Sequence, residues 1–172
     1  VTGNTQDNII TGNVGNNVID GGEGNDTFVT QGNFDESTGI LNQDGSVTLT
    51  SNGGGTDSLI NIENVQFDDG VKPLNELGFY TDVSMSLPEW LNDIVIQGDG
   101  NISVIGNTQD NVITGNVGNN VIDGKDGNDT FVTQGNFDQS TGILNKDGSV
   151  SLTSDGGTDT LINIKNIQFD DG

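Results

Sequence analysis

Glycine, polar and large apolar residues recur in this chain at a spacing of nine, and this repeat constrains the fold more than any other feature. Three units stand end to end near the N-terminus, namely Gly3–Thr11 (GNTQDNIIT), Gly12–Asp20 (GNVGNNVID) and Gly21–Val29 (GGEGNDTFV). Glycine opens each unit, the sixth residues are Asn8, Asn17 and Asp26, and the eighth residues are Ile10, Ile19 and Phe28. Positions that recur in step indicate a repeat architecture rather than independent secondary-structure elements.

The whole N-terminal segment is duplicated later in the chain. Residues 3–53 align without gaps to residues 106–156 and are identical at 44 of 51 positions. The second run of units is Gly106–Thr114, Gly115–Asp123 and Gly124–Val132. We therefore predict that both copies share one fold.

Three regions follow from this duplication. We expect copy one at residues 1–70, a linker at residues 71–103 and copy two at residues 104–172. The linker contains both prolines and the only Met, Trp and Tyr of the chain. Within it, the segment Ser86–Asp93 (SLPEWLND) combines a Ser that can act as N-cap, an early Pro and a Glu three residues after the Ser. This combination predicts a short helix.

The residues after each run of units have a different period, which is typical of strands. In copy one, Ser46–Ser51 (SVTLTS) alternates in strand fashion after the turn signal Asp44-Gly45. Asp57–Phe67 (DSLINIENVQF) spaces its apolar residues irregularly, so we expect a strand with a bend. These segments predict additional strands that cap each copy.

The charge of the chain selects its partners. Twenty-six Asp and Glu residues against four Lys give a net charge of −22, which argues strongly against binding to nucleic acid. Such a chain is expected to fold poorly until cations neutralise its carboxylates. Because it has no Cys and no His, zinc, copper and iron lack their preferred ligands, whereas oxygen ligands suit calcium. No apolar run is long enough to span a membrane.

The units resemble the hemolysin-type, or RTX, calcium-binding nonapeptide G-G-x-G-x-D-x-U-x, in which U is a large apolar residue. The match is best in Gly21–Val29 and in Gly124–Val132 (GKDGNDTFV). The resemblance implies an all-β fold: a short right-handed parallel β-roll, or β-solenoid, in each copy. In that fold each coil holds two nonapeptides, units n and n+2 stack, and the eighth residue fills the core.

Carried over to this chain, the resemblance pairs Asn8 with Asp26 and Asn111 with Asp129 as the best calcium sites. It adds main-chain carbonyl ligands from the glycine-rich turns, which include Gly21, Gly22, Gly24, Gly124 and Gly127. The first two units of each copy depart from the pattern because their sixth residue is Asn rather than Asp. An amide oxygen can coordinate but brings no charge, so we expect fewer or weaker calcium ions, with affinities on the order of 10⁻⁴ to 10⁻³ M.

A degenerate fourth turn is expected where the nine-residue count continues, at Thr30–Asp35. It would pair Asp35 with Asn17 and, in copy two, Asp138 with Asn120. Ser37 and Ser140 occupy the expected core position, so this unit is expected to leave the roll rather than to extend it.

Other interpretations of the polar residues stay open. Stacked Asn side chains could form hydrogen-bonded ladders in a metal-free solenoid, with Asp26 serving only a turn. For Asp44 and Asp147 we favour hairpin turns. Asp57 and Asp159 follow glycine-rich runs and could close a turn around an ion, but a plain loop is the favoured interpretation.

The function predicted from these features is that of a non-catalytic calcium-binding RTX-type module. We expect it to belong to a larger secreted or cell-surface bacterial protein and to fold on binding calcium. The alternative is a carbohydrate- or surface-binding module in which Trp90, Phe79 and Tyr80 stack on polysaccharide. Enzyme activity is not expected, because the Asp residues lie in glycine-rich turns and no His, Cys or Arg is present to assist them.

Overall fold

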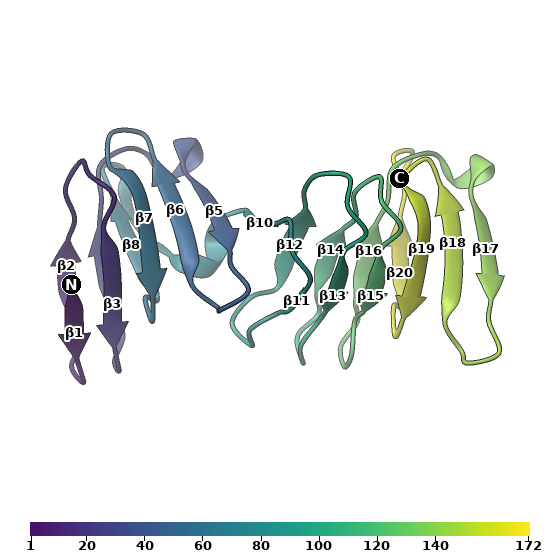
Figure 1. Cartoon of the computed structure of the whole chain (residues 1–172), viewed down its shortest axis with the longest axis horizontal. Coiled ribbons are helices and arrows are strands. Elements are labelled where there is room, and N and C mark those ends of the chain that lie inside the picture. Colours follow the sequence, from purple (N-terminus) through teal and green to yellow (C-terminus); the bar gives the residue numbers. More distant parts are fainter. The chain divides into compact units, whose positions relative to one another are not determined.

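The computed structural model describes residues 1–172, which divide into two compact units, Val1–Phe79 (unit 1) and Tyr80–Gly172 (unit 2). Both units consist of short strands and single 3₁₀ turns, without any α-helix (Figure 1). The all-β prediction is therefore confirmed. None of the helical segments has the length or the apolar character needed to cross a membrane.

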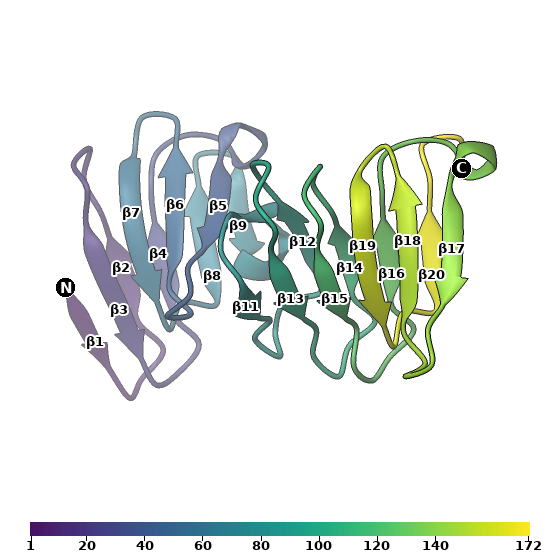
Figure 2. The same cartoon turned by 45° about the vertical axis from the view of Figure 1, so that its right-hand side comes forward.

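Unit 1 contains nine strands and two 3₁₀ turns. They are β1 (Thr2–Asn4), β2 (Ile9–Thr11), β3 (Val18–Gly22), β4 (Thr27–Val29), η1 (Phe34–Glu36), β5 (Thr38–Leu41), β6 (Val47–Ser51), β7 (Gly55–Ile60), β8 (Asn64–Phe67), β9 (Gly70–Pro73) and η2 (Leu74–Glu76). They form two sheets, ordered β1-β3-β7-β6-β5 and β2-β4-β8-β9. Figure 2 shows these sheets as two facing layers.

Successive coils of the roll pair in parallel. Thr2 of β1 pairs with Asp20 of β3, and Ile9 of β2 pairs with Thr27 of β4, each 18 residues further along the chain. Two nonapeptides therefore make one coil, and units n and n+2 stack as the resemblance implies. The eighth residues face inward: Ile19 is 1% exposed and Phe28 is fully buried.

The roll is interrupted after its second coil and then resumes. After β4 the chain forms η1 and the antiparallel hairpin β5–β6, so the unit at residue 30 does leave the roll. The chain then returns, and β7 pairs in parallel with β3 while β8 pairs in parallel with β4. These two strands build a third coil, whereas the sequence predicts them only as capping strands. The bend expected in Asp57–Phe67 is a full turn at Asn61 (φ 50°) that carries the chain from one sheet to the other.

Unit 2 repeats this arrangement and adds a coil in front of it. Its elements are β10 (Phe79–Thr81, which begins at the last residue of unit 1), β11 (Met85–Ser86), β12 (Asp93–Ile96), β13 (Ser103–Ile105), β14 (Val112–Thr114), β15 (Val121–Asp123), β16 (Thr130–Val132), η3 (Phe137–Gln139), β17 (Thr141–Leu144), β18 (Val150–Ser154), β19 (Gly157–Ile162) and β20 (Asn166–Gln168). The sheets are β10-β12-β14-β16-β20 and β11-β13-β15-β19-β18-β17. The core again comes from eighth residues, including Ile113, Ile122 and Phe131, all fully buried.

The segment predicted as a linker contains strands that join the roll of unit 2. β12 pairs with β14, and β11 pairs with β13, both in parallel. The short helix predicted at Ser86–Asp93 is absent. The segment is instead a single turn in which the Leu91 amide donates to the Pro88 carbonyl at 3.0 Å. The capping pattern fails here because Leu87 and Leu91 are both buried and the following residues must extend to pair with β14. The three-region division at residues 70 and 103 stays a prediction.

Candidate metal centres

The turns that join β1 to β2 and β3 to β4 stack directly, and this brings the predicted partners together. The backbone amide of Asn8 donates to Asp26 Oδ1 at 2.7 Å. In unit 2 the amide of Asn111 donates to Asp129 Oδ1 at 2.9 Å. The side chain of each sixth-position Asp therefore points toward the preceding coil.

The second oxygen of each of these carboxylates lacks a partner. Asp26 and Asp129 are fully buried, and Oδ2 of each has no hydrogen-bond donor. An ionised carboxylate oxygen that is removed from water without a partner costs about 1–3 kcal/mol or more. A cation beside these oxygens would remove this cost, so the residues present fit a bound calcium ion.

Glycine is required in the turns because the coils approach closely. Gly24 (φ +125°) is so near the preceding coil that a Cβ there would lie 2.8 Å from the Gln6 carbonyl oxygen. A Cβ on Gly21 would collide with Asp26 Oδ2 and with the Asn61 carbonyl oxygen. The other predicted site glycines are placed alike: Gly22 lies against the Asn4 carbonyl, Gly127 against the Gln109 carbonyl, and Gly124 against Asp129 Oδ2. Backbone carbonyl oxygens thus lie in the same glycine-rich turns as the Asp carboxylates, and calcium accepts both kinds of oxygen ligand.

The Asn-containing turns differ from the Asp-containing turns because their side chains donate hydrogen bonds to the preceding coil. Asn107 Nδ2 donates to the carbonyls of Pro88 at 2.7 Å and Leu91 at 2.8 Å, and Asn111 Nδ2 donates to those of Leu91 and Asn92. These amide groups supply the positive partners that the preceding coil's carbonyls need. These bonds join Asn side chains to main-chain carbonyls and are not the ladder of stacked Asn side chains considered from the sequence. The Asp side chains at the same position lack such donors.

The predicted partners of Asn17 and Asn120 are wrong. Asp35 and Asp138 are exposed and lie in η1 and η3, outside the stacked turns. The amide of Asn17 instead donates to Asp57 Oδ1, and that of Asn120 to Asp159 Oδ1, both at 2.8 Å. The nine-residue count fails because the hairpin is inserted between the second and third coils.

A local signal marks Asp57 and Asp159 as members of the same class. All four buried Asp residues follow a glycine of positive φ by two positions, at Gly24, Gly55, Gly127 and Gly157. A search for Gly-x-Asp directly before a strand or at its start would have found them without the nine-residue count.

Burial also changes the acidity of these two carboxylates. Loss of solvent raises the pKa of Asp159 to about 6, against the smaller opposite effect of the Asn120 amide. The pKa of Asp57 is raised for the same reason. A folded-state pKa above the unfolded value means that stability is lost as the pH rises through about 6, unless a cation accompanies the charge.

The two units differ at one residue of the third coil, which lies next to the turn of Asp26 in unit 1 and of Asp129 in unit 2. In unit 1, Glu63 Oε2 accepts the backbone amide of Asp26 at 2.7 Å. In unit 2 the equivalent residue is Lys165, whose Nζ donates to the Asn163 carbonyl at 2.8 Å. A negative side chain in one unit is thus replaced by a positive one in the other.

Other acidic residues have structural partners. Asp44 and Asp147 lie in the hairpin turns, as predicted, and the Ser46 and Ser149 hydroxyls lower the pKa of their carboxyl groups. Nowhere do three acidic side chains converge on one point. A metal ion in this chain must therefore take most of its ligands from backbone and amide oxygens.

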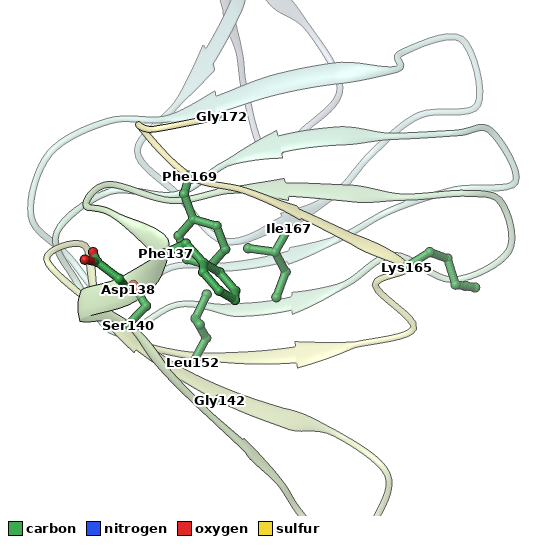
Figure 3. A pocket seen from close by; sticks show the side chains of 9 residues that line it. All are labelled: Phe137, Asp138, Ser140, Gly142, Leu152, Lys165, Ile167, Phe169 and Gly172. Atoms are coloured by element: carbon green, nitrogen blue, oxygen red, sulfur yellow. The ribbon is translucent and has the colours of Figure 1, made fainter.

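A shallow apolar hollow lies at the hairpin end of unit 2. Figure 3 shows Phe137, Leu152, Ile167 and Phe169 gathered there, with Lys165 extending away from them. In unit 1 the Phe79 ring covers the corresponding surface, close enough that a Cβ on Gly39 would lie 2.8 Å from it. Since Phe79 is buried, the sugar-stacking set proposed from the sequence is reduced to Trp90, which is 39% exposed, and the half-buried Tyr80.

Comparison with known families agrees with the geometry of the turns. The family described as RTX calcium-binding nonapeptide repeat (4 copies) matches residues 1–35 and 96–131. Within these two segments the chain is similar to RTX calcium-binding repeats, and there it forms coils of the parallel β-roll. No curated protein sequence matches the chain.

Among solved structures, the chain is similar to the extracellular lipase LipA from Serratia marcescens. The identity is 18% and the TM-score is 0.38, over 94% of this chain and 37% of the lipase chain. The chain thus spans little more than a third of the length of this protein.

Proposed function

We propose that this chain is a non-catalytic, calcium-stabilised module of a larger secreted or cell-surface bacterial protein, and that its rolls fold when calcium binds. Asp26 with the Asn8 turn, and Asp129 with the Asn111 turn, hold the ions in this proposal. Calcium, when bound, supplies positive charge to the buried carboxylates and to the carbonyl oxygens around them. The protein contributes turns in which glycine lets these oxygens converge.

One observation carries the proposal. Among the buried side-chain nitrogen and oxygen atoms, only Oδ2 of each buried Asp has no hydrogen-bond partner. A net charge of −22 adds long-range repulsion that divalent cations would reduce. Folding and calcium binding should therefore be coupled, because a site assembled only by the folded turns gives its binding energy to folding.

Calcium titration followed by circular dichroism and calorimetry tests this function. We expect β-structure to form as calcium reaches about 10⁻⁴ to 10⁻³ M, and magnesium to be far less effective, since it resists exchanging its waters for carbonyl oxygens. Asp26→Ala and Asp129→Ala should each shift the folding transition to higher calcium concentration.

Asp44→Ala is the matched control, because it removes the same charge from an exposed hairpin turn. It should leave the transition in place. A chain that binds no calcium, or that responds equally to all three substitutions, contradicts the proposed sites.

Fewer observations support the carbohydrate-binding alternative, because only Trp90 and Tyr80 of the predicted stacking residues are accessible. A pull-down with insoluble polysaccharide, compared between the wild type and Trp90→Ala, checks it. Calcium-dependent retention that disappears in Trp90→Ala would favour this alternative over a purely structural module.

A further inference from the structure

Each roll contains a fourth nonapeptide that the hairpin separates from the other three. In unit 1, residues 52–60 read NGGGTDSLI, with Gly55, Asp57 and Leu59 at the fourth, sixth and eighth positions. In unit 2, residues 154–162 read SDGGTDTLI. Both segments lie outside the residues that the repeat family matches.

The register of the sheets supports this assignment. Ile19 pairs with Leu59, so the sixth position of the displaced unit stacks on that of the second unit. In unit 2, Ile122 pairs with Leu161 in the same way. Leu59 is 1% and Leu161 3% exposed, which is the burial expected of an eighth residue.

We propose that Asp57 and Asp159 form a second pair of calcium sites, one on the opposite side of each roll from Asp26 and Asp129. This inference extends the proposed function to two turns that a count along the sequence does not reach. Each carboxylate is fully buried, accepts one backbone amide through Oδ1, and has no donor for Oδ2.

Carbonyl oxygens lie close to both turns. A Cβ on Gly55 (φ +99°) would be 3.0 Å from the carbonyl oxygens of Val14 and Gly15. A Cβ on Gly157 (φ +103°) would be 2.8 Å from the Gly118 carbonyl oxygen. Gly24 approaches the Gln6 carbonyl of its preceding coil in the same manner, so these turns reproduce the arrangement around Asp26. Buried carboxylate and carbonyl oxygens form the ligand set that calcium prefers.

Counting bound ions tests the inference directly. Equilibrium dialysis against saturating calcium should give one ion for each of the four unpartnered carboxylates in the wild type. Asp57→Asn and Asp159→Asn should each remove one ion, and the double variant should remove two. Asn is the appropriate replacement because Asn17 and Asn120 already occupy sixth positions in this stack.

Asp44→Asn together with Asp147→Asn provides the control, since it removes equal charge from the exposed hairpin turns. This pair should keep the full number of ions. A wild type that binds two ions overturns the inference even if the Asp57 and Asp159 variants do not fold. An unchanged ion count in a folded Asp57→Asn, Asp159→Asn double variant also overturns it.

Different results would contradict the proposed function and the second pair of calcium sites. If the wild type binds no calcium, the proposed function itself is wrong. If Asp26→Asn and Asp129→Asn each remove one ion while Asp57→Asn and Asp159→Asn remove none, only the second pair of sites is excluded.

Discussion

At the scale of single residues, the side chain at the sixth position of each turn determines whether the carbonyl oxygens of the preceding coil receive hydrogen bonds. An Asn such as Asn111 donates amide hydrogens to carbonyls of the preceding coil. An Asp such as Asp129 cannot donate, and one of its oxygens has no partner. The exchange of the Asn NH₂ group for an Asp oxygen thus separates a turn whose side-chain atoms all have partners from a turn in which calcium would supply the missing partner.

The exchange of Glu63 for Lys165 predicts that unit 2 binds calcium more weakly than unit 1. An ammonium group near the Asn163 carbonyl repels a second cation, whereas a carboxylate attracts it. We therefore expect Lys165→Glu to tighten calcium binding by unit 2 about fivefold, which corresponds to ~1 kcal/mol. Calorimetric titration of the full chain measures this change.

Lys146→Glu is the control for this exchange. It makes the same change of charge in the same unit, but on the exposed hairpin, and should alter the affinity much less. Equal effects of the two substitutions would show that only the total charge matters and would contradict a local role for Lys165.

At the scale of elements, the turns are held together by backbone geometry that only glycine adopts without strain. Gly24 and Gly127 combine positive φ with a carbonyl oxygen of the preceding coil directly where a side chain would stand. The strands are only two to six residues long, so each contributes few hydrogen bonds of its own. Stacking of the turns therefore adds contacts between coils beyond those of the paired strands.

Gly24→Ala tests this role of the turn. The substitution combines an unfavourable φ with a collision against the Gln6 carbonyl, so we expect calcium-saturated unit 1 to lose about 1–3 kcal/mol of its free energy of unfolding. Urea denaturation in saturating calcium measures the loss.

Gly45→Ala separates the two causes. Gly45 also has positive φ (+84°), but no atom lies within 4 Å of the position of its Cβ. Its cost should be limited to backbone strain, about 1 kcal/mol. A larger loss from Gly45→Ala than from Gly24→Ala would contradict the importance of close coil stacking.

At the scale of the whole molecule, two rolls follow one another in a chain that carries a net charge of −22. Unit 1 closes with residues beyond the duplicated segment. β9 pairs with β8, and Leu74, Leu77 and Phe79 are all at most 5% exposed. These residues belong to the part of the sequence from which we expected only a linker.

A comparison of two fragments tests where unit 1 ends. Residues 1–79 should fold with calcium, whereas residues 1–70, which end at the boundary predicted from the duplication, should be markedly less stable. Burial of a large apolar side chain contributes about 1.5–3 kcal/mol, so loss of Leu74, Leu77 and Phe79 accounts for a decrease in stability on the order of 5 kcal/mol. Thermal unfolding of both fragments in saturating calcium measures it, and equal stability would support the boundary at residue 70.

The sequence by itself determined the nine-residue repeat, the β-roll that it resembles and the stacking of Asp26 and Asp129 on the turns of Asn8 and Asn111, because a nine-residue period leaves its residue types visible in every unit. It also predicted the hairpin turns at Asp44 and Asp147. Only the tertiary structure decided that Asp57 and Asp159, rather than Asp35 and Asp138, stack on Asn17 and Asn120. The reason is physical: parallel strand pairing joins residues across an inserted hairpin, so spatial register is set by hydrogen bonds between coils and not by distance along the chain. The same pairing converts the expected helix at Ser86–Asp93 into a turn that leads into β12, because a neighbouring strand offers more hydrogen bonds than an isolated helical turn can form.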